Sequence, residues 1–120
     1  MIRIIVVCDY KIYVFNFDDL QNIDMADTHE NSKGIFLSFS YSSLFKIKGI
    51  IAVSSDPKIT VIAYPDKNRG HVRVRNYDKR ISNLINAHES EIVNVALNSD
   101  GSLLATASHQ VHFWILKREH

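Results

Sequence analysis

The stretch that decides the fold covers residues 87–108 and reads AHESEIVNVALNSDGSLLATAS. Two apolar runs, 91–98 and 103–108, flank the turn residues Asp100 and Gly101, and this pattern predicts a β-hairpin. His88 precedes the first run, whereas small residues end the second. Small side chains suit an inner strand where neighbouring sheets converge, since bulky ones would clash there. We therefore expect the second run to lie at the inner side of its sheet, with its hydroxyls bonding polar groups nearby.

The rest of the chain also consists of short strand-like runs. The runs 3–9 and 11–17 flank a short polar break and predict a second hairpin. In the latter run, Ile12 and Val14 alternate with Tyr13 and Phe15, so both faces of this strand are apolar. Further strand-like runs lie at 34–40, 49–55, 59–65, 70–78, 81–87 and 110–116, with a weaker outer segment at 18–28. No helical apolar period persists, so we predict an all-β protein of about ten or eleven strands.

The spacing of these strand groups predicts the architecture. The groups recur at about 40 residues, which is the period of a four-stranded propeller blade. We therefore predict a partial β-propeller of about two to three four-stranded antiparallel blades in a single domain. Residues 1–28 would form the end of one blade, 29–87 a central blade, and 88–120 the truncated start of the next.

Composition limits the class of protein. The chain has 120 residues, 46% of them apolar, and a formal net charge of +1, so no strong overall field attracts a polyanion. Cys8 is the only cysteine, which excludes an intrachain disulfide and favours a reducing compartment. The apolar stretch 2–8 is too short for a signal peptide or a membrane span. We expect a soluble, cytoplasmic protein.

Sequence motifs for catalysis or metal binding are missing. The chain contains no glycine-rich phosphate loop, nucleophile elbow or paired catalytic carboxylates, so we expect no enzyme. The six histidines lack metal-ligand spacing, and His109 and His112 would point to opposite faces of a strand. We therefore expect neither a metal nor a cofactor.

Residues 67–80 form the segment in which basic side chains are most concentrated. Arg73 and Arg75 share one strand face and could form a membrane-facing stripe, to which each basic residue near an anionic surface adds about 1 kcal/mol. The alternative is a solvated blade edge that Asp66 and Asp78 partly neutralise. Binding to RNA would require aromatic platforms beside the cations, and only Tyr77 is close, so no nucleic-acid partner is expected.

Four stretches, 3–20, 27–34, 63–74 and 85–108, carry a family resemblance through their order and spacing. Together they resemble the PROPPIN family, the WD-repeat-like β-propellers that bind phosphoinositides. The resemblance implies a scaffold of autophagy that is cytoplasmic and peripheral on preautophagosomal or endosomal and vacuolar membranes. It implies two kinds of partner: membranes carrying phosphatidylinositol 3-phosphate or 3,5-bisphosphate, and autophagy proteins.

The resemblance also implies candidate lipid-binding residues. The positions that match the family's lipid pocket are His88, Ser90, Thr106 and Ser108. An imidazole and hydroxyls can donate hydrogen bonds to phosphate, more strongly when the imidazole is protonated. A structural alternative exists for each: His88 could bond turn backbone, and Thr106 and Ser108 could pack beside the channel.

Two departures from the family pattern matter. Lys-Gly occurs at 33–34 and again at 48–49, so residues 35–49 resemble an insertion; the alternative is an extra strand with a turn at 41–43. The family's paired lipid-binding arginines in an Arg-Arg-Gly motif are also missing. We therefore expect weak lipid binding or none, and the alternative function is a WD-repeat-type interaction fragment without lipid binding. Two open sheet faces would make the isolated chain marginally stable or oligomeric.

Overall fold

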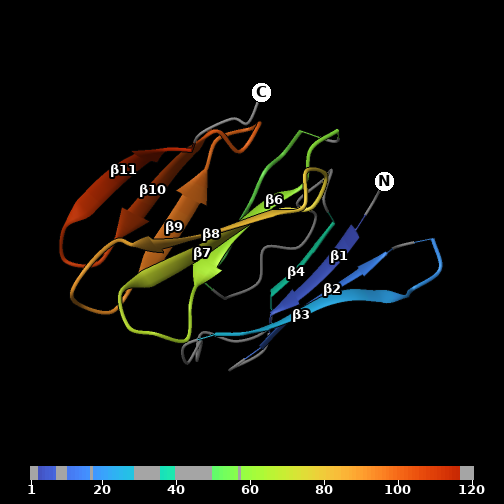
Figure 1. Cartoon of the computed structure of the whole chain (residues 1–120), viewed down its shortest axis with the longest axis horizontal. Coiled ribbons are helices and arrows are strands. Elements are labelled where there is room, and N and C mark those ends of the chain that lie inside the picture. Colours follow the sequence, from blue (N-terminus) through green and yellow to red (C-terminus); the bar gives the residue numbers. More distant parts are fainter. Residues whose placement is uncertain are drawn as a thin grey trace.

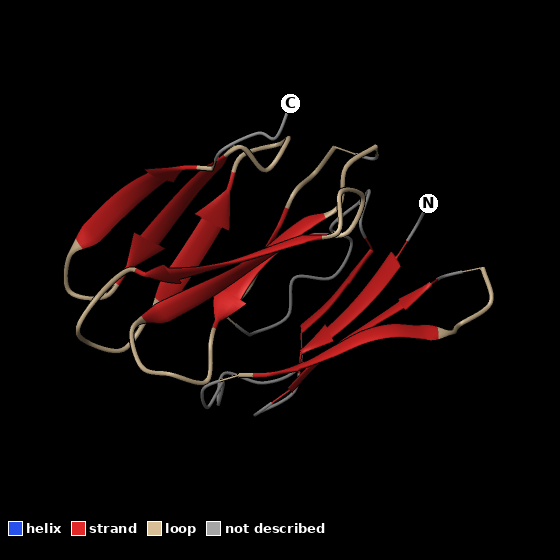
Figure 2. Ribbon diagram, viewed as in Figure 1, coloured by secondary structure: helices blue, strands red, loops and turns tan. Residues whose placement is uncertain are grey.

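A computed structural model describes residues 3–7, 11–16, 18–28, 36–39, 50–56 and 58–116, with the backbone alone at 7 and 36–39. Over these ranges every regular element is a strand (Figure 2). The described residues contain eleven strands, which form three antiparallel sheets that lie face to face (Figure 1). The prediction of an all-β partial propeller is confirmed.

The first sheet has the strand order β3-β2-β1-β4. Its strands are β1 (Arg3–Val7), β2 (Lys11–Asn16), β3 (Asn22–Asp27) and β4 (Phe36–Phe39). The predicted hairpin β1–β2 is present, with Ile5 opposite Val14. Strand β4 pairs antiparallel with β1 and supplies the fourth position of the sheet. It falls inside the segment 35–49, for which an insertion and an extra strand both stay predictions, and the expected turn at 41–43 lies outside the described residues.

The second and third sheets follow in chain order. The second has the order β5-β6-β7-β8, with β5 (Ala52–Val53), β6 (Val61–Pro65), β7 (His71–Asn76) and β8 (Ile81–Asn86). The third has the order β11-β10-β9, with β9 (Asn94–Leu97), β10 (Leu103–Ala107) and β11 (Val111–Ile115). The small-residue strand β10 is therefore central in its sheet. The expected inner placement is wrong, because β10 pairs with β9 on one side and with β11 on the other.

The core consists of two apolar layers on either side of the second sheet. All five residues of β6 are buried, because successive side chains enter opposite layers. Ile62 and Tyr64 pack with Ile5 and Val14 of the first sheet. The opposite layer joins residues of the second and third sheets, among them Val61, Ala63, Val74, Val95 and Leu104. The second sheet is thus covered on both faces, as the continuous apolar run of β6 predicts.

Two glycines allow the sheets to approach one another. Gly101, in the turn between β9 and β10, has φ 72°, and a Cβ there would lie 2.6 Å from Cγ2 of Val61. Gly70, which precedes β7, has φ 78°, and a Cβ there would overlap the His88 carbonyl oxygen. Backbone amides of Ala87 and His88 both donate to the Gly70 carbonyl at 3.0 Å. Gly70 therefore fixes the loop that carries the candidate site.

Candidate functional site

Three of the four predicted lipid-binding residues meet at one end of the third sheet. His88 lies in the loop after β8, and its Nε2 is 2.9 Å from Thr106 Oγ1 on β10. The Nδ1 atom of the same ring is 3.2 Å from Ser108 Oγ, just past the end of β10. Ser90 lies farther along the loop, and its Oγ is 3.3 Å from Nε2 of His109. The side chains of His88 and Thr106 are thus tied to each other rather than to turn backbone.

Trp114 completes this chain of hydrogen bonds. Its Nε1 donates to Thr106 Oγ1 at 3.0 Å. We assign the remaining protons so that Thr106 donates to Nε2 of His88, and Nδ1–H of His88 donates to Ser108. This assignment gives each donor one acceptor and keeps His88 neutral. It leaves the hydroxyl proton of Ser108 available to an acceptor in the pocket, whereas the Thr106 hydroxyl is engaged with His88 and Trp114.

Two further histidines line the same pocket. The ring of His112 on β11 contacts the ring of His88 edge-on, with centroids 4.7 Å apart. His109 lies in the turn before β11 and lines the pocket with His112. The expectation that these two side chains point to opposite faces of a strand is therefore wrong, because only His112 is in the strand. The lining residues are Asn86, Ala87, His88, Glu89, Ser90, Ser108, His109, Gln110 and His112.

The electrostatics of this pocket favour a neutral His88. Burial lowers the pKa of His88 below its ordinary value, and the neighbouring His112 and His109 lower it further, while a backbone hydrogen bond to Thr106 opposes them. None of the described residues that line the pocket is Lys or Arg, and Glu89 adds a negative charge. Over the described residues, no group of side chains is arranged to hold a metal ion. The pocket therefore offers hydrogen-bond donors more than fixed positive charge.

The two arginines of the basic run have partners within the fold. Arg75 donates from Nε to the Tyr64 hydroxyl at 2.8 Å and pairs with Asp24 of the first sheet at 3.1 Å. Arg73 lies 3.6 Å from Asp66 and donates to Ser82 at 3.2 Å. Both contacts reduce the charge that these side chains present to solvent. A membrane-facing role for Arg73 and Arg75 stays a prediction.

A buried network surrounds Arg75 where the first and second sheets meet. Tyr77 donates to Asp24 at 2.6 Å, and burial together with this carboxylate raises the pKa of the Tyr77 hydroxyl. Burial also raises the pKa of Tyr64, although the hydrogen bond from Arg75 opposes the effect. Both tyrosines thus stay protonated. The network joins the two sheets. Asp24 and Tyr77 are 53 residues apart in the chain, so local sequence patterns could not predict their contact.

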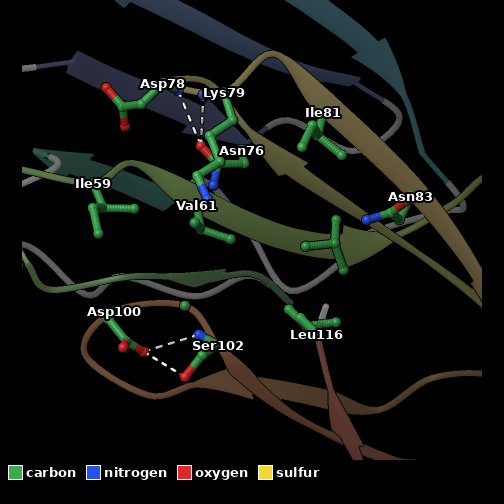
Figure 3. A pocket seen from close by; sticks show the side chains of 12 residues that line it. Ile59, Val61, Asn76, Asp78, Lys79, Ile81, Asn83, Asp100, Ser102 and Leu116 are labelled. Atoms are coloured by element: carbon green, nitrogen blue, oxygen red, sulfur yellow. Dashed lines mark hydrogen bonds between the residues drawn. The ribbon is translucent and has the colours of Figure 1, made fainter. Parts of the chain in front are cut away.

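A second cavity, of about 130 Å³, lies between the second and third sheets (Figure 3). Its apolar wall includes Ile59, Ile81 and Leu116. Several of its polar groups are engaged with one another: Ser102 donates twice to Asp100, and the backbone amides of residues 78 and 79 donate to the Asn76 side chain (Figure 3). These bonds close turns, so Asn76, Asp100 and Ser102 have structural partners in this cavity.

Comparison with known proteins identifies the family. The chain is 30% identical over 108 residues to autophagy-related protein 18 of Dictyostelium discoideum, and 31% identical over 106 residues to autophagy-related protein 18e of Arabidopsis thaliana. Each match covers 88% of the chain. The chain is a distant PROPPIN homologue. SVP1-like protein 2 of Debaryomyces hansenii is 29% identical over an alignment of 126 positions, which covers 89% of the chain.

This PROPPIN homologue spans only 25% and 24% of the length of the Dictyostelium and Arabidopsis relatives. No family model matches it. The family resemblance drawn from the sequence is confirmed, and the names of the relatives connect the family with autophagy. Over the part of the chain that the structure describes, no helix is long and apolar enough to cross a membrane.

Proposed function

We propose that this chain is part of a phosphoinositide-binding propeller scaffold of autophagy and has no enzymatic activity. Its partners would be membranes with phosphatidylinositol 3-phosphate or 3,5-bisphosphate and other autophagy proteins. The chain would act in the cytoplasm, peripherally on preautophagosomal or endosomal and vacuolar membranes. The observation that carries the proposal is the convergence of Ser108, Ser90 and three histidines on one open pocket in a homologue of autophagy-related proteins.

The chemistry of the pocket suits a phosphate monoester, although weakly. Hydroxyl and imidazole groups can donate several hydrogen bonds to phosphate oxygens. Guanidinium forks, the stronger phosphate ligands, do not line this pocket among the described residues. Because the pKa of His88 is lowered, its positive charge becomes available only on acidification. We therefore expect lipid binding to be weak at neutral pH and stronger at acidic pH.

Liposome flotation tests this proposal. We expect a fraction of the chain to float with vesicles that contain phosphatidylinositol 3-phosphate and not with vesicles of phosphatidylcholine alone, and the bound fraction should rise at acidic pH. The double variant Ser90→Ala, His109→Ala should lower the bound fraction across the pH range, since it removes two lining hydrogen-bonding side chains that carry no packing in the core. Lys67→Ala, an exposed change of charge outside the pocket, is the control. Equal flotation with both vesicle types would contradict the proposal.

A second function is favoured by one specific observation. Arg73 and Arg75 are engaged with Asp66 and Asp24, and none of the described residues that line the pocket is Lys or Arg, so the pocket itself holds no fixed positive charge. This favours a protein-interaction fragment of the WD-repeat type without lipid binding. The absence of lipid-dependent flotation at every pH would support this second function over the first.

A further inference from the structure

Ser82 lies among arginine side chains at the edge of the second sheet. It is the second residue of β8, and it is exposed to solvent. Arg73 donates from Nη1 to the Ser82 hydroxyl oxygen at 3.2 Å, and Arg75 lies directly opposite Ser82 in the register of β7 and β8. Residues paired in this way have Cβ atoms about 5 Å apart on the same face of the sheet. Two arginines therefore flank the hydroxyl.

Arg80 adds a third cation beside Ser82. It ends the turn between β7 and β8 and lines, together with Arg75 and Ser82, a groove of about 510 Å³ between the first and second sheets. Of the ion pairs between described residues, none includes Arg80. Its φ of 55° is a conformation that glycine or asparagine adopts more readily, and strained residues of this kind gather at functional sites. An unpaired guanidinium group is thus held at the mouth of the groove.

The segment around Ser82 is accessible to an enzyme. Among the described strands, β8 is an edge strand of its sheet, so one side of its extended backbone is unpaired. Asn83 and Leu84, which follow Ser82, are also exposed. Lys79 and Arg80 lie three and two residues before it, and both are exposed. Protein kinases select their substrates by charge patterns, and this pattern suits a kinase whose substrate groove is acidic.

We propose that Ser82 is a phosphorylation site whose phosphate is held by Arg73, Arg75 and Arg80. In the reaction, the Ser82 hydroxyl oxygen attacks the γ-phosphorus of a nucleoside triphosphate bound to a protein kinase. The bond from that phosphorus to the bridging oxygen breaks, the nucleoside diphosphate leaves, and the hydroxyl proton passes to a base of the kinase. The groove beside Ser82 shares no lining residue with the pocket around His88, so this site is independent of the proposed lipid site.

The charges of the groove determine what the phosphate does. A phosphoserine carries a charge of about −1.5 to −2 at neutral pH, and its oxygens accept bidentate hydrogen bonds from guanidinium groups. Asp24 also lines the groove and repels the phosphate, but it is already engaged with Arg75 and Tyr77. The charge of Arg80 is therefore the one that the phosphate neutralises. Phosphorylation stabilises the β7–β8 hairpin and withdraws an exposed cation from the surface.

Phosphorylation of the full chain in vitro tests whether an enzyme recognises the site. We expect the catalytic subunit of cyclic-AMP-dependent protein kinase, which selects serines that follow basic residues, to transfer phosphate from ATP to Ser82, as located by peptide mass spectrometry. The double variant Lys79→Gln, Arg80→Asn should slow the transfer about tenfold or more, and Asn tolerates the positive φ. The matched control is Lys67→Gln, Arg69→Asn, which removes two exposed charges from the β6–β7 turn. No phosphate on Ser82, or equal rates for the two double variants, would overturn the proposal.

The unfolding temperature tests whether the arginines hold the phosphate. A chain phosphorylated at Ser82 should unfold about 4 °C higher than the unmodified chain, which is the scale of one charge-assisted hydrogen bond in a chain of this size. In an Arg73→Gln background the same phosphate should raise the temperature by about half as much or less. Phosphoserine introduced at Ser99 during translation is the control, because Ser99 is exposed beside Asp100 and should give no rise. A phosphate on Ser82 that raises the unfolding temperature no more than one on Ser99 would overturn the proposal.

The pKa of the phosphate provides a readout that does not depend on stability. The second pKa of phosphoserine is ordinarily about 6, and neighbouring guanidinium groups lower it because they favour the dianion. A phosphorus NMR titration should therefore give a lower pKa for phosphorylated Ser82 than for phosphorylated Ser99. Arg80→Asn should raise the pKa at Ser82 toward its ordinary value. Equal pKa values at the two serines would show that the arginines do not hold the phosphate and would contradict the proposal.

Discussion

The second and third sheets show what burial adds to a strand pattern. Val74 on β7 and Phe113 on β11 are equivalent in pairing, and both belong to apolar alternations. Val74 is buried between two sheets, whereas Phe113 is open to solvent. The same apolar alternation therefore contributes differently to the free energy of folding in the two sheets. In the second sheet it stabilises the fold, and in the third sheet it places apolar side chains in contact with solvent.

The largest expected effect concerns the loop that joins the second sheet to the third. Gly70→Ala would force a methyl group into the His88 carbonyl oxygen at a residue with positive φ. We expect a loss of about 3 kcal/mol in the free energy of unfolding, which is the scale of backbone overlap with strain. Urea unfolding measures it. Gly101→Ala is the comparison: its clash is with the Val61 side chain. A Gly70→Ala chain as stable as the wild type would contradict the close approach.

The next effect tests the comparison of the two sheets directly. Val74→Ala removes two buried methyl groups and should lower the free energy of unfolding by about 2 kcal/mol. Phe113→Ala removes a larger side chain but should change it by less than about 0.5 kcal/mol at concentrations where the chain is monomeric. Thermal or urea unfolding of both variants gives the difference. Equal losses would mean that the third sheet is covered within a single chain.

The smallest effect is the pH dependence of stability at His88. Its pKa is lower in the folded state than in the unfolded state, so the unfolded chain binds more protons once the pH falls below the ordinary value of about 6.5. Stability should therefore decrease on acidification through this range. His88→Gln, which keeps a hydrogen-bonding side chain, should flatten the decrease. Urea midpoints measured across this pH range will show whether the slope belongs to His88.

This pH effect also connects stability with the proposed lipid site. A bound phosphate would favour the charged form of His88 and raise its pKa. Acidification should then destabilise the free chain and strengthen binding at the same time. Unfolding measured with and without a soluble inositol phosphate separates the two effects, because ligand that binds only the folded state adds stability.

The strands and hairpins were predictable because their signals are local. The turn at Asp100 and Gly101 and the alternation around Ile12 and Val14 each involve residues close in sequence, and the structure has the expected strands there. The pairing of β4 with β1 was not predictable in the same way, because the residues 36–39 carry no local signal that specifies which strand they pair with.

The candidate site was predictable only in part. His88, Thr106 and Ser108 were found through their match to a family pattern, and the structure brings them into hydrogen-bond contact. Trp114 and His112 were not predicted as part of the site. The register of the β10–β11 hairpin places His112 opposite Thr106, so deriving that register from the sequence would have located both residues. The partner of Arg75 was hidden, because Asp24 lies on another sheet.

The sequence by itself determined the all-β class, the hairpins and the two-face alternation of the strands, because these depend on backbone geometry and on neighbouring residues. Only the tertiary structure decided which faces are covered and which polar groups meet. Alternation marks two faces equally and does not say what lies against each. That depends on contacts between sheets, such as Asp24 with Tyr77 and Gly101 with Val61, that join residues far apart in the chain.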